Sequence, residues 1–182
     1  MNKLLFCALF CACLSASAQT FSFKSNEGSI FLMNESPGGK ARVYYFLSPE
    51  CPLCQSYSLT IRNIYAEFAK QGIEMVGIIP GNDFSNKDIL EYEIKYKIPL
   101  MLLRDEQLML VKKYNVTITP EVVLVNTQGK VIYQGRIDNW AYELGKKRKV
   151  ITEYNLKDAL TSVLLNKPIS VSKTKAVGCY IE

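Results

Sequence analysis

The sequence contains no histidine, and its six cysteines include a single Cys-x-x-Cys pair. Zinc sites made from cysteine and histidine, or from two such pairs, are therefore excluded, although three cysteines with a carboxylate stay open as a ligand set. No motif for binding a flavin or nicotinamide is visible, so we expect no cofactor. There is also no internal repeat and no low-complexity tract, and the hydrophobic content of 48% indicates a globular protein.

An export signal is predicted for residues 1–18. Lys3 supplies its positive charge, residues 4–14 its apolar run, and residues 16–18 an Ala-x-Ala cleavage site. The apolar run is too short to span a membrane, so we expect an exported, periplasmic protein. The alternative is a lipoprotein signal processed at Cys13, although the residues before Cys13 fit that pattern poorly.

Cleavage after residue 18 leaves three cysteines in the mature chain, Cys51, Cys54 and Cys179. An odd number of cysteines in an exported protein suggests a reactive thiol. The remaining length suits one compact domain, residues 19–166, followed by a tail at residues 167–182 that carries Cys179.

The net charge of +5 is a mild basic excess, most of it in residues 146–149. A solvated loop explains this run, an acidic partner surface is the alternative, and nucleic acid is not expected as a partner of an exported protein. The run lies within residues 137–151, which also hold the only tryptophan, Trp140, and which we interpret as a long loop.

Cys51 and Cys54 stand where a predicted strand, residues 42–48, gives way to a predicted helix. Pro52 suits the first position of that helix, so Cys51 would lie at its N-terminus, where free N–H groups and the helix dipole favour a thiolate. Cys54 lies one turn further on and can close a disulfide with Cys51. Redox-active thiols are the favoured interpretation, and an inert structural disulfide or a metal site are the alternatives. The apolar face of the helix is formed at the 3.6-residue period by Tyr57, Ile61, Ile64, Tyr65 and Phe68.

The other patterns predict an α/β order of elements. Residues 73–80 read as a buried strand, which would lie parallel to residues 42–48 after a helical crossover. Ser85 and Asp88 form a capping box that opens a helix ending at Ile98. The remaining expected elements are two short strands within 21–33, a strand at 100–103, a helix at 106–114, an antiparallel hairpin of strands 121–126 and 130–136, and a last helix with Asn155 as its N-cap.

This order, with Thr119-Pro120 leading into a hairpin and a last helix, resembles the thioredoxin-like fold in its redoxin or peroxiredoxin-related branch. The resemblance covers about residues 25–166 and implies a three-layer α/β/α domain with a central mixed sheet. It also implies a cis Thr119-Pro120 bond beside the reactive cysteine, which leaves the backbone of Thr119 free to pair with a substrate strand.

A closer likeness is to exported bacterial redoxin-domain proteins. Members of this group sometimes lack the second cysteine of the pair and keep a terminal one, which makes Cys179 a rival to Cys54 as the partner of Cys51. A small buried residue that holds the tail on the domain is the alternative role for Cys179. The matching motifs are Leu-Ser-x-x-Cys-Pro at 47–52, Gly-Arg-Ile-Asp at 135–138, a Leu-Gly-Lys-Arg-Arg-like loop at 144–148 and Lys-x-x-Gly-Cys at 175–179.

Three features depart from these relatives. Glu50 stands where thioredoxins have a tryptophan, and its negative charge opposes a Cys51 thiolate. The peroxidatic pattern Pro-x-x-x-Thr/Ser-x-x-Cys is half met, because Ser48 fits while Tyr44 replaces the proline. The histidine needed by copper-chaperone relatives of this fold is absent, which counts against that role.

The resemblance favours an extracytoplasmic thiol–disulfide oxidoreductase. Cys51 would attack a protein disulfide, a mixed disulfide would form beside Thr119-Pro120, and Cys54 would displace the substrate. A membrane or exported thiol carrier would then reduce the enzyme. The alternatives are a thiol peroxidase, in which Cys54 or Cys179 resolves a Cys51 sulfenic acid, and a binding module that has lost its chemistry. The sequence leaves the substrate, the redox direction and the oligomeric state open.

Overall fold

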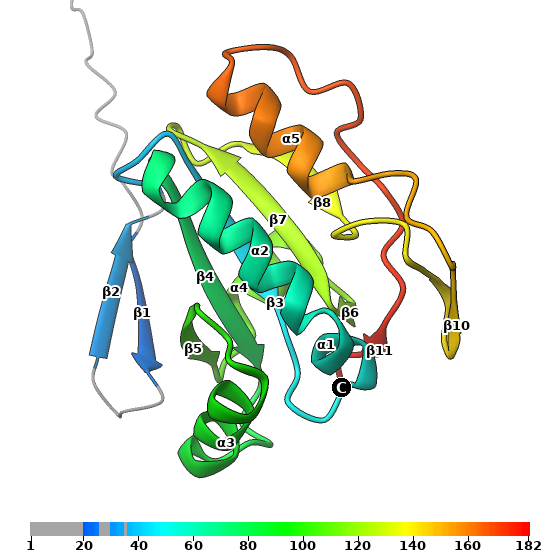
Figure 1. The fold of residues 1–182 in the computed structure, drawn as a ribbon. Helices are drawn as coiled ribbons and strands as arrows, with labels where there is room; N and C mark the ends of the chain where they lie inside the picture. The colour runs from blue at the N-terminus through cyan, green and yellow to red at the C-terminus, as the bar shows by residue number, and fades with distance from the viewer. Residues whose placement is uncertain (1–19, 26–29, 35) are drawn as a thin grey trace, which may run out of the picture.

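The computed structural model of the chain describes residues 20–25, 30–34 and 36–182. The predicted export signal, with Cys13, lies outside the described residues. A mixed sheet forms the centre of the domain, with strands β1 (Thr20–Ser25), β2 (Ile30–Asn34), β3 (Ala41–Phe46), β4 (Ile73–Pro80), β5 (Met101–Asp105), β7 (Glu121–Asn126) and β8 (Val131–Gly135). Their order across the sheet is β2-β1-β5-β4-β3-β7-β8 (Figure 1).

The sheet is mixed because its middle strands are parallel and its outer strands are not. β3, β4 and β5 run parallel to one another. β7 is antiparallel to β3, β8 to β7, and β1 to both β5 and β2. The predicted crossover from β3 to β4 and the predicted hairpin of β7 and β8 are therefore confirmed.

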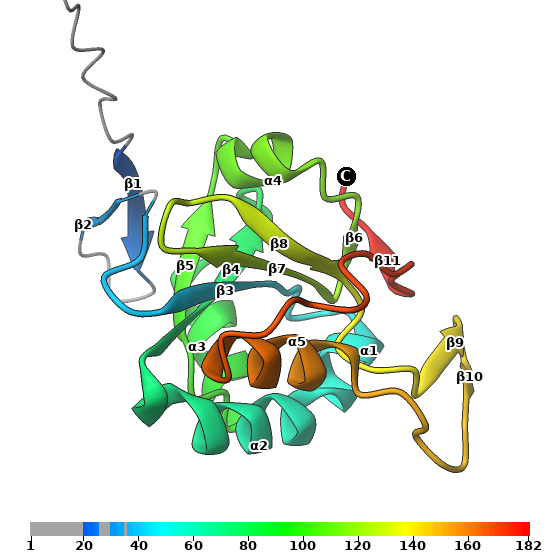
Figure 2. The same ribbon diagram turned by 90° about the horizontal axis from the view of Figure 1, so that it is seen from above.

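Helices cover both faces of this sheet: α1 (Pro52–Ser56), α2 (Ser58–Phe68), α3 (Asn86–Tyr96), α4 (Met109–Tyr114) and α5 (Asn155–Leu164). Figure 2 shows α2 and α5 on one face and α4 on the other. All six residues of β3 are buried. Because side chains alternate along a strand, Tyr45 packs in the same apolar cluster as Leu160 of α5, whereas Tyr44 and Phe46 pack in the cluster of Leu110 of α4. The three-layer α/β/α fold is thus confirmed.

The helix that follows the cysteine pair is interrupted. Tyr57 is a turn residue between α1 and α2, although its backbone stays in the right-handed helical region, with φ of −76° and ψ of −5°. The segment ends in a 3-10 turn at Ala69–Gln71. Gly72 then adopts the left-handed conformation, with φ of 86°, which suits glycine because it carries no Cβ. The sequence predicts one continuous helix after the cysteine pair, and it did not reveal the turn at Tyr57.

The helix predicted at 106–114 begins three residues later than expected. Leu108 has a left-handed backbone, with φ of 55°, and precedes the first residue of α4. The buried carboxylate of Asp105 accepts the backbone N–H groups of Met109, Leu110 and Val111 at 2.7, 2.9 and 3.1 Å. These are the N–H groups that a helix start leaves unpaired, so Asp105 at the end of β5 fixes where α4 begins.

Two other expectations are corrected. Asn155 is the first residue of α5 and not its N-cap, which is Tyr154; the Asn155 Oδ1 atom instead accepts the Arg136 Nε–H at 2.8 Å. The stretch 137–151, predicted as a loop, contains a small hairpin of β9 (Ala141–Glu143) and β10 (Lys146–Lys147). The capping box of Ser85 is confirmed at the start of α3.

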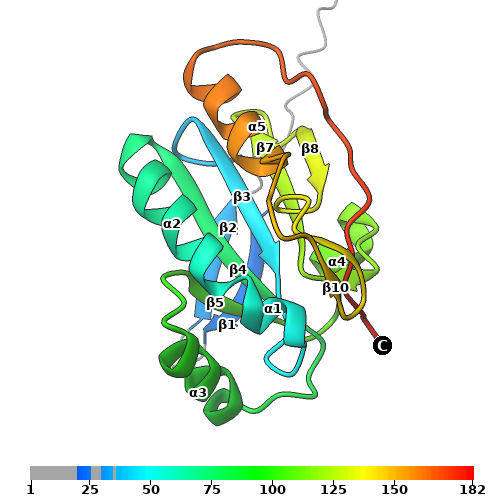
Figure 3. The ribbon, with the colours of Figure 1, turned by 45° about the vertical axis from the view of Figure 1, so that its right-hand side comes forward.

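The tail returns to the domain. It runs beside β8 (Figure 3), where the backbones of Gln134 and Lys173 form a bridge. Its last strand, β11 (Cys179–Tyr180), pairs antiparallel with the short strand β6 (Ile118–Thr119). This pairing brings Cys179 to the junction of β3 and α1.

Candidate active site

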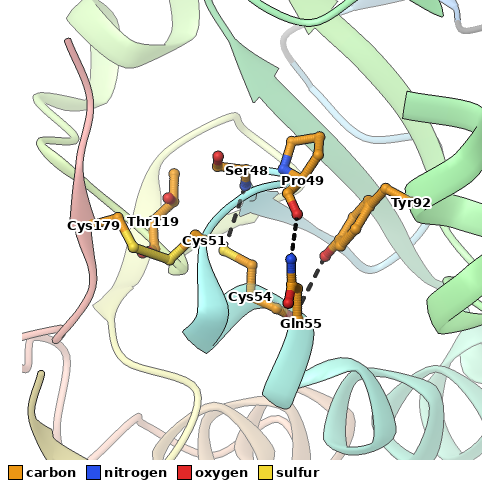
Figure 4. Close-up of a disulfide and its surroundings, with 8 residues drawn as sticks. All are labelled: Ser48, Pro49, Cys51, Cys54, Gln55, Tyr92, Thr119 and Cys179. Carbon is orange, nitrogen blue, oxygen red and sulfur yellow. Dashed lines mark hydrogen bonds between the residues drawn. A yellow bond between two sulfur atoms is a disulfide. The ribbon is translucent and has the colours of Figure 1, made fainter. Parts of the chain in front are cut away.

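The junction of β3 and α1 presents Cys51 at the start of a helix. Cys51 is the N-cap of α1 and Pro52 occupies the first turn, as the sequence predicts. The Cys51 N–H donates to the Ser48 carbonyl at 3.2 Å, and the Gln55 side-chain amide donates to the Pro49 carbonyl at 2.8 Å. These bonds hold the turn that carries the two cysteines, and Figure 4 shows the one from Gln55 to Pro49.

Cys51 is bonded to Cys179 and not to Cys54. The two Cα atoms of this disulfide lie 6.0 Å apart and are separated by 128 residues in sequence. The Cys51 Sγ atom lies 3.2 Å from the carbonyl oxygen of Thr119, directly before the cis Thr119-Pro120 bond. The structure therefore brings together Cys51, Cys179, Thr119 and Pro120, and it realises the rival pairing rather than the Cys-x-x-Cys disulfide.

Cys54 is a free thiol that is fully buried. Burial raises the pKa of Cys54 to about 12, although the Ser48 N–H, which donates to its Sγ atom at 3.4 Å, acts in the opposite direction. The Tyr92 hydroxyl donates to the Cys54 backbone carbonyl at 3.4 Å. With the tail docked, Cys54 is thus a protonated thiol beneath the disulfide.

The buried Cys54 thiol is expected to resist alkylation in the oxidised native protein. At a pH near 8, a thiol with a pKa of about 12 is ionised to roughly one part in ten thousand, and the thiolate is the reactive form. Labelling with iodoacetamide followed by mass spectrometry should find Cys54 unmodified near pH 8 in the native protein and modified at the same pH in denaturant. Rapid native labelling near pH 8 would contradict the burial of Cys54.

A cavity of about 360 Å³ opens beside the disulfide. Its charged lining residues are Glu50, Asp83 and Glu182, and no lysine or arginine lines it in the described part of the chain. Three carboxylates disfavour the gathering of further negative charge near Cys51. In addition, the described residues contain no group of three cysteine, aspartate or glutamate side chains arranged to hold a metal ion.

Asp138 of the Gly-Arg-Ile-Asp motif contacts Tyr57, next to the cysteine-bearing helix α1. The buried Asp138 accepts the Tyr57 hydroxyl and the Trp140 N–H, both at 2.8 Å, through its Oδ1 atom. Tyr57 lies at the break between α1 and α2, so this bond ties the cysteine-bearing helix to the chain after β8. Sequence reasoning assigned Tyr57 to packing only, and no local pattern in the sequence pointed to this contact.

Asp138 is expected to make stability depend on pH. Burial raises the pKa of Asp138, and this effect exceeds the lowering by its two hydrogen bonds and by the charge of Arg136. A raised native pKa means that native Asp138 binds its proton more tightly than the unfolded chain, so its contribution is full in acid and is lost as the pH rises through the native pKa. Asp138→Asn removes this titration and keeps an oxygen acceptor.

Urea unfolding of wild type and Asp138→Asn across a pH series from about 3 to 8 measures the effect. The free energy of unfolding of Asp138→Asn minus that of wild type should increase as the pH rises. If this difference in free energy stays constant across the pH series, Asp138 has the same pKa in the folded and unfolded states and the prediction is wrong.

Comparison with known proteins identifies the family of the chain. A Redoxin family model matches residues 15–144. The chain is 34% identical over 86 residues to the chloroplastic peroxiredoxin Q of Sedum lineare, which covers 47% of this chain and 45% of the relative. The chloroplastic peroxiredoxin Q of Oryza sativa subsp. japonica is 31% identical over 91 residues, 50% of this chain and 41% of the relative. The chain thus spans less than half the length of these relatives.

Solved structures share the fold at lower identity. A hypothetical protein from Sinorhizobium meliloti 1021 superposes with a TM-score of 0.78 at 22% identity, covering 90% of this chain and 91% of the other. A secreted Mycobacterium tuberculosis disulfide oxidoreductase homologous to E. coli DsbE gives a TM-score of 0.53 at 20% identity, covering 80% and 95%. No helix within the described ranges is both long and apolar enough to cross a membrane. With its thioredoxin-like fold and the match over most of its length, the chain belongs to the Redoxin family.

Proposed function

We propose that this chain is an exported thiol–disulfide oxidoreductase in which Cys51 is the nucleophile. The observation that carries the proposal is the disulfide between Cys51 and a cysteine on an extended segment paired with Thr119. A protein substrate caught on Cys51 would present the same arrangement, a strand beside Thr119-Pro120 with its sulfur bonded to Cys51. The site therefore has the shape that a mixed disulfide requires.

The first step of the proposed reaction is attack of the Cys51 thiolate on a substrate disulfide. One S–S bond breaks, a bond forms between Cys51 Sγ and one substrate sulfur, and the other substrate sulfur leaves as a thiolate that takes up a proton. Cys51 is the N-cap of α1, and a helix start favours a thiolate over a thiol because its first N–H groups have no partner within the helix.

The second step releases the substrate. We assign it to Cys54, because a segment docked as the tail is docked would occupy the place of Cys179. The Cys54 thiol loses its proton and attacks Cys51 Sγ, the bond to the substrate breaks, and the departing substrate thiolate is protonated. A membrane-bound or exported dithiol would then reduce the Cys51–Cys54 disulfide, with its two thiols oxidised in exchange.

Trapping tests the proposal. The double variant Cys54→Ser with Cys179→Ser should accumulate a mixed disulfide with a peptide that contains an internal disulfide, visible as a reducible gel shift. The single variant Cys51→Ser should give none. If no peptide is trapped and the Cys51–Cys179 bond of wild type opens only in denaturant, the chain is instead a binding module with a structural disulfide.

A thiol peroxidase is the second candidate, favoured by the matches to peroxiredoxin Q and by the Cys51–Cys179 bond. Peroxide would oxidise the Cys51 thiolate to a sulfenic acid with loss of alcohol or water, and the Cys179 thiol would form the disulfide and release water. The carboxylates of the adjacent cavity oppose the negative charge of the departing oxygen, as they also oppose the Cys51 thiolate on which both candidate reactions depend. Peroxide consumption by the reduced protein tests this candidate, because Cys51 of a thiol peroxidase must react with peroxide far faster than free cysteine does.

A further inference from the structure

The edge of β6 is the surface that the tail covers. In the described chain β6 pairs with no strand other than β11, with Cys179 opposite Thr119 and Tyr180 opposite Ile118. The Ile181 N–H extends this pairing by donating to the Thr117 carbonyl at 3.0 Å. When the tail leaves, the backbone of β6 is therefore an unpaired edge directly beside Cys51.

Gly178 is the tightest point of this pairing. A Cβ atom built at Gly178 would overlap the carbonyl group of Thr119 and would lie 3.1 Å from the Pro120 nitrogen. Both obstacles are backbone, held by the disulfide site itself, so they cannot move aside as a flexible side chain does. Any segment that docks in this way needs a residue without a side chain immediately before its cysteine.

The tail is also held at a second place, away from the cysteines. The Gln134 N–H donates to the Ser172 carbonyl and the Thr174 N–H donates to the Gln134 carbonyl, both at 3.0 Å. The Thr174 hydroxyl accepts the Arg136 N–H at 3.0 Å and lies 2.8 Å from the Tyr133 hydroxyl. These contacts do not involve sulfur, so reduction of the disulfide does not itself break them. We therefore expect residues 172–174 to stay on β8 in the reduced protein while the last part of the tail is set free.

From this geometry we propose that the edge of β6 docks extended protein segments in which glycine directly precedes the reactive cysteine, and that the tail is an internal copy of such a segment. The inference rests on the proposed oxidoreductase function and names its substrate class. The tail competes with the substrate for the edge of β6. Gly178 corresponds to the glycine that precedes the reactive cysteine of the substrate.

The Cys51–Cys179 disulfide is then equivalent to a mixed disulfide with the tail in place of a substrate. Attack of the Cys54 thiolate on Cys51 Sγ would break it, form Cys51–Cys54 and release Cys179, which takes up the proton that Cys54 gave to solvent. The burial of Cys54 opposes this exchange as long as the tail stays docked. We therefore expect the tail to leave β6 when Cys54 displaces Cys179 from Cys51.

Two synthetic peptides test the inference. One has the sequence of residues 173–182, the other has valine in place of its glycine, and each carries its cysteine as a mixed disulfide with thionitrobenzoate. The test protein is the reduced full chain with Cys7, Cys11, Cys13, Cys54 and Cys179 all changed to serine, so that Cys51 is its only cysteine. With this protein the glycine peptide should release thionitrobenzoate at least about tenfold faster than the valine peptide. Free cysteine is the control and should react with both peptides at the same rate.

The outcomes separate the two proposals. Equal and rapid reaction of Cys51 with both peptides would overturn the glycine rule while leaving the oxidoreductase function intact. Reaction with both peptides no faster than that of free cysteine would overturn the oxidoreductase function, and the glycine rule with it.

A variant of the tail gives an independent measurement. In a Cys54→Ser background, Gly178→Val should lower the ratio of Cys51–Cys179 disulfide to dithiol at least tenfold in a glutathione redox buffer. Lys175→Val is the matched control, because Lys175 is exposed in the same tail and already has a Cβ atom. An unchanged ratio in Gly178→Val would contradict the requirement for glycine.

Discussion

Oxidised wild-type protein is expected to be more stable than Cys179→Ser by about 5 kcal/mol in its free energy of unfolding. The Cys51–Cys179 bond closes a loop of 128 residues, and a cross-link of that span removes much of the conformational freedom of the unfolded chain. Urea unfolding of both proteins in an oxidising buffer measures the difference. By linkage, the same energy makes the disulfide harder to reduce in the native protein than in the unfolded one, by roughly 100 mV.

Reduction provides the control for this prediction. In excess dithiothreitol the stabilities of wild type and Cys179→Ser should converge, because neither protein then has the cross-link. A difference below about 1 kcal/mol under oxidising conditions, well short of the loop-entropy value, would mean that Cys51 and Cys179 are not joined in solution.

Turnover of a peptide disulfide is expected to fall about 100-fold in Cys54→Ser and to persist at the wild-type rate or above in Cys179→Ser. A resolving thiol on the same helix turn as Cys51 acts at a high effective molarity, which an external reductant at millimolar concentration does not match. Cys179 competes with the substrate for β6, so its removal cannot slow substrate entry. Steady-state reduction with dithiothreitol as the electron source measures both rates.

The opposite pattern would be equally informative. A slow Cys179→Ser and a normal Cys54→Ser would make Cys179 the resolving thiol and the tail a working part of the cycle. Cys51→Ser is the control for both, since it removes the nucleophile and should leave only the uncatalysed reaction with dithiothreitol.

Local patterns predicted most of the fold. The mostly apolar runs at residues 42–48 and 73–80 were enough to predict two parallel strands, and the Ser85 capping box marked the start of α3 correctly. The start of α4 was missed because its signal, Asp105, stands at the end of the preceding strand and caps the helix across a left-handed residue. That geometry depends on tertiary packing and leaves no periodic trace.

The site was predicted less completely than the fold. The position of Cys51 follows from a strand, a proline and a helix that are neighbours in sequence, and the structure has it there. The choice between Cys54 and Cys179 depends on how a tail 128 residues away returns to β6, which spacing alone does not encode. The contact of Tyr57 with Asp138 is of the same long-range kind, and it too was not predicted.

The attachment of residues 172–174 to β8 is expected to keep the freed end of the tail close to β6 after reduction. Only a few residues separate Thr174 from Cys179. This short linker keeps the Cys179 sulfur near Cys51 at an effective concentration of the order of millimolar. An outside protein present at micromolar levels must therefore bind this edge far better than the tail does, or arrive while the tail is away. The short tail thus protects Cys51 from disulfide exchange with proteins that bind the edge of β6 only weakly.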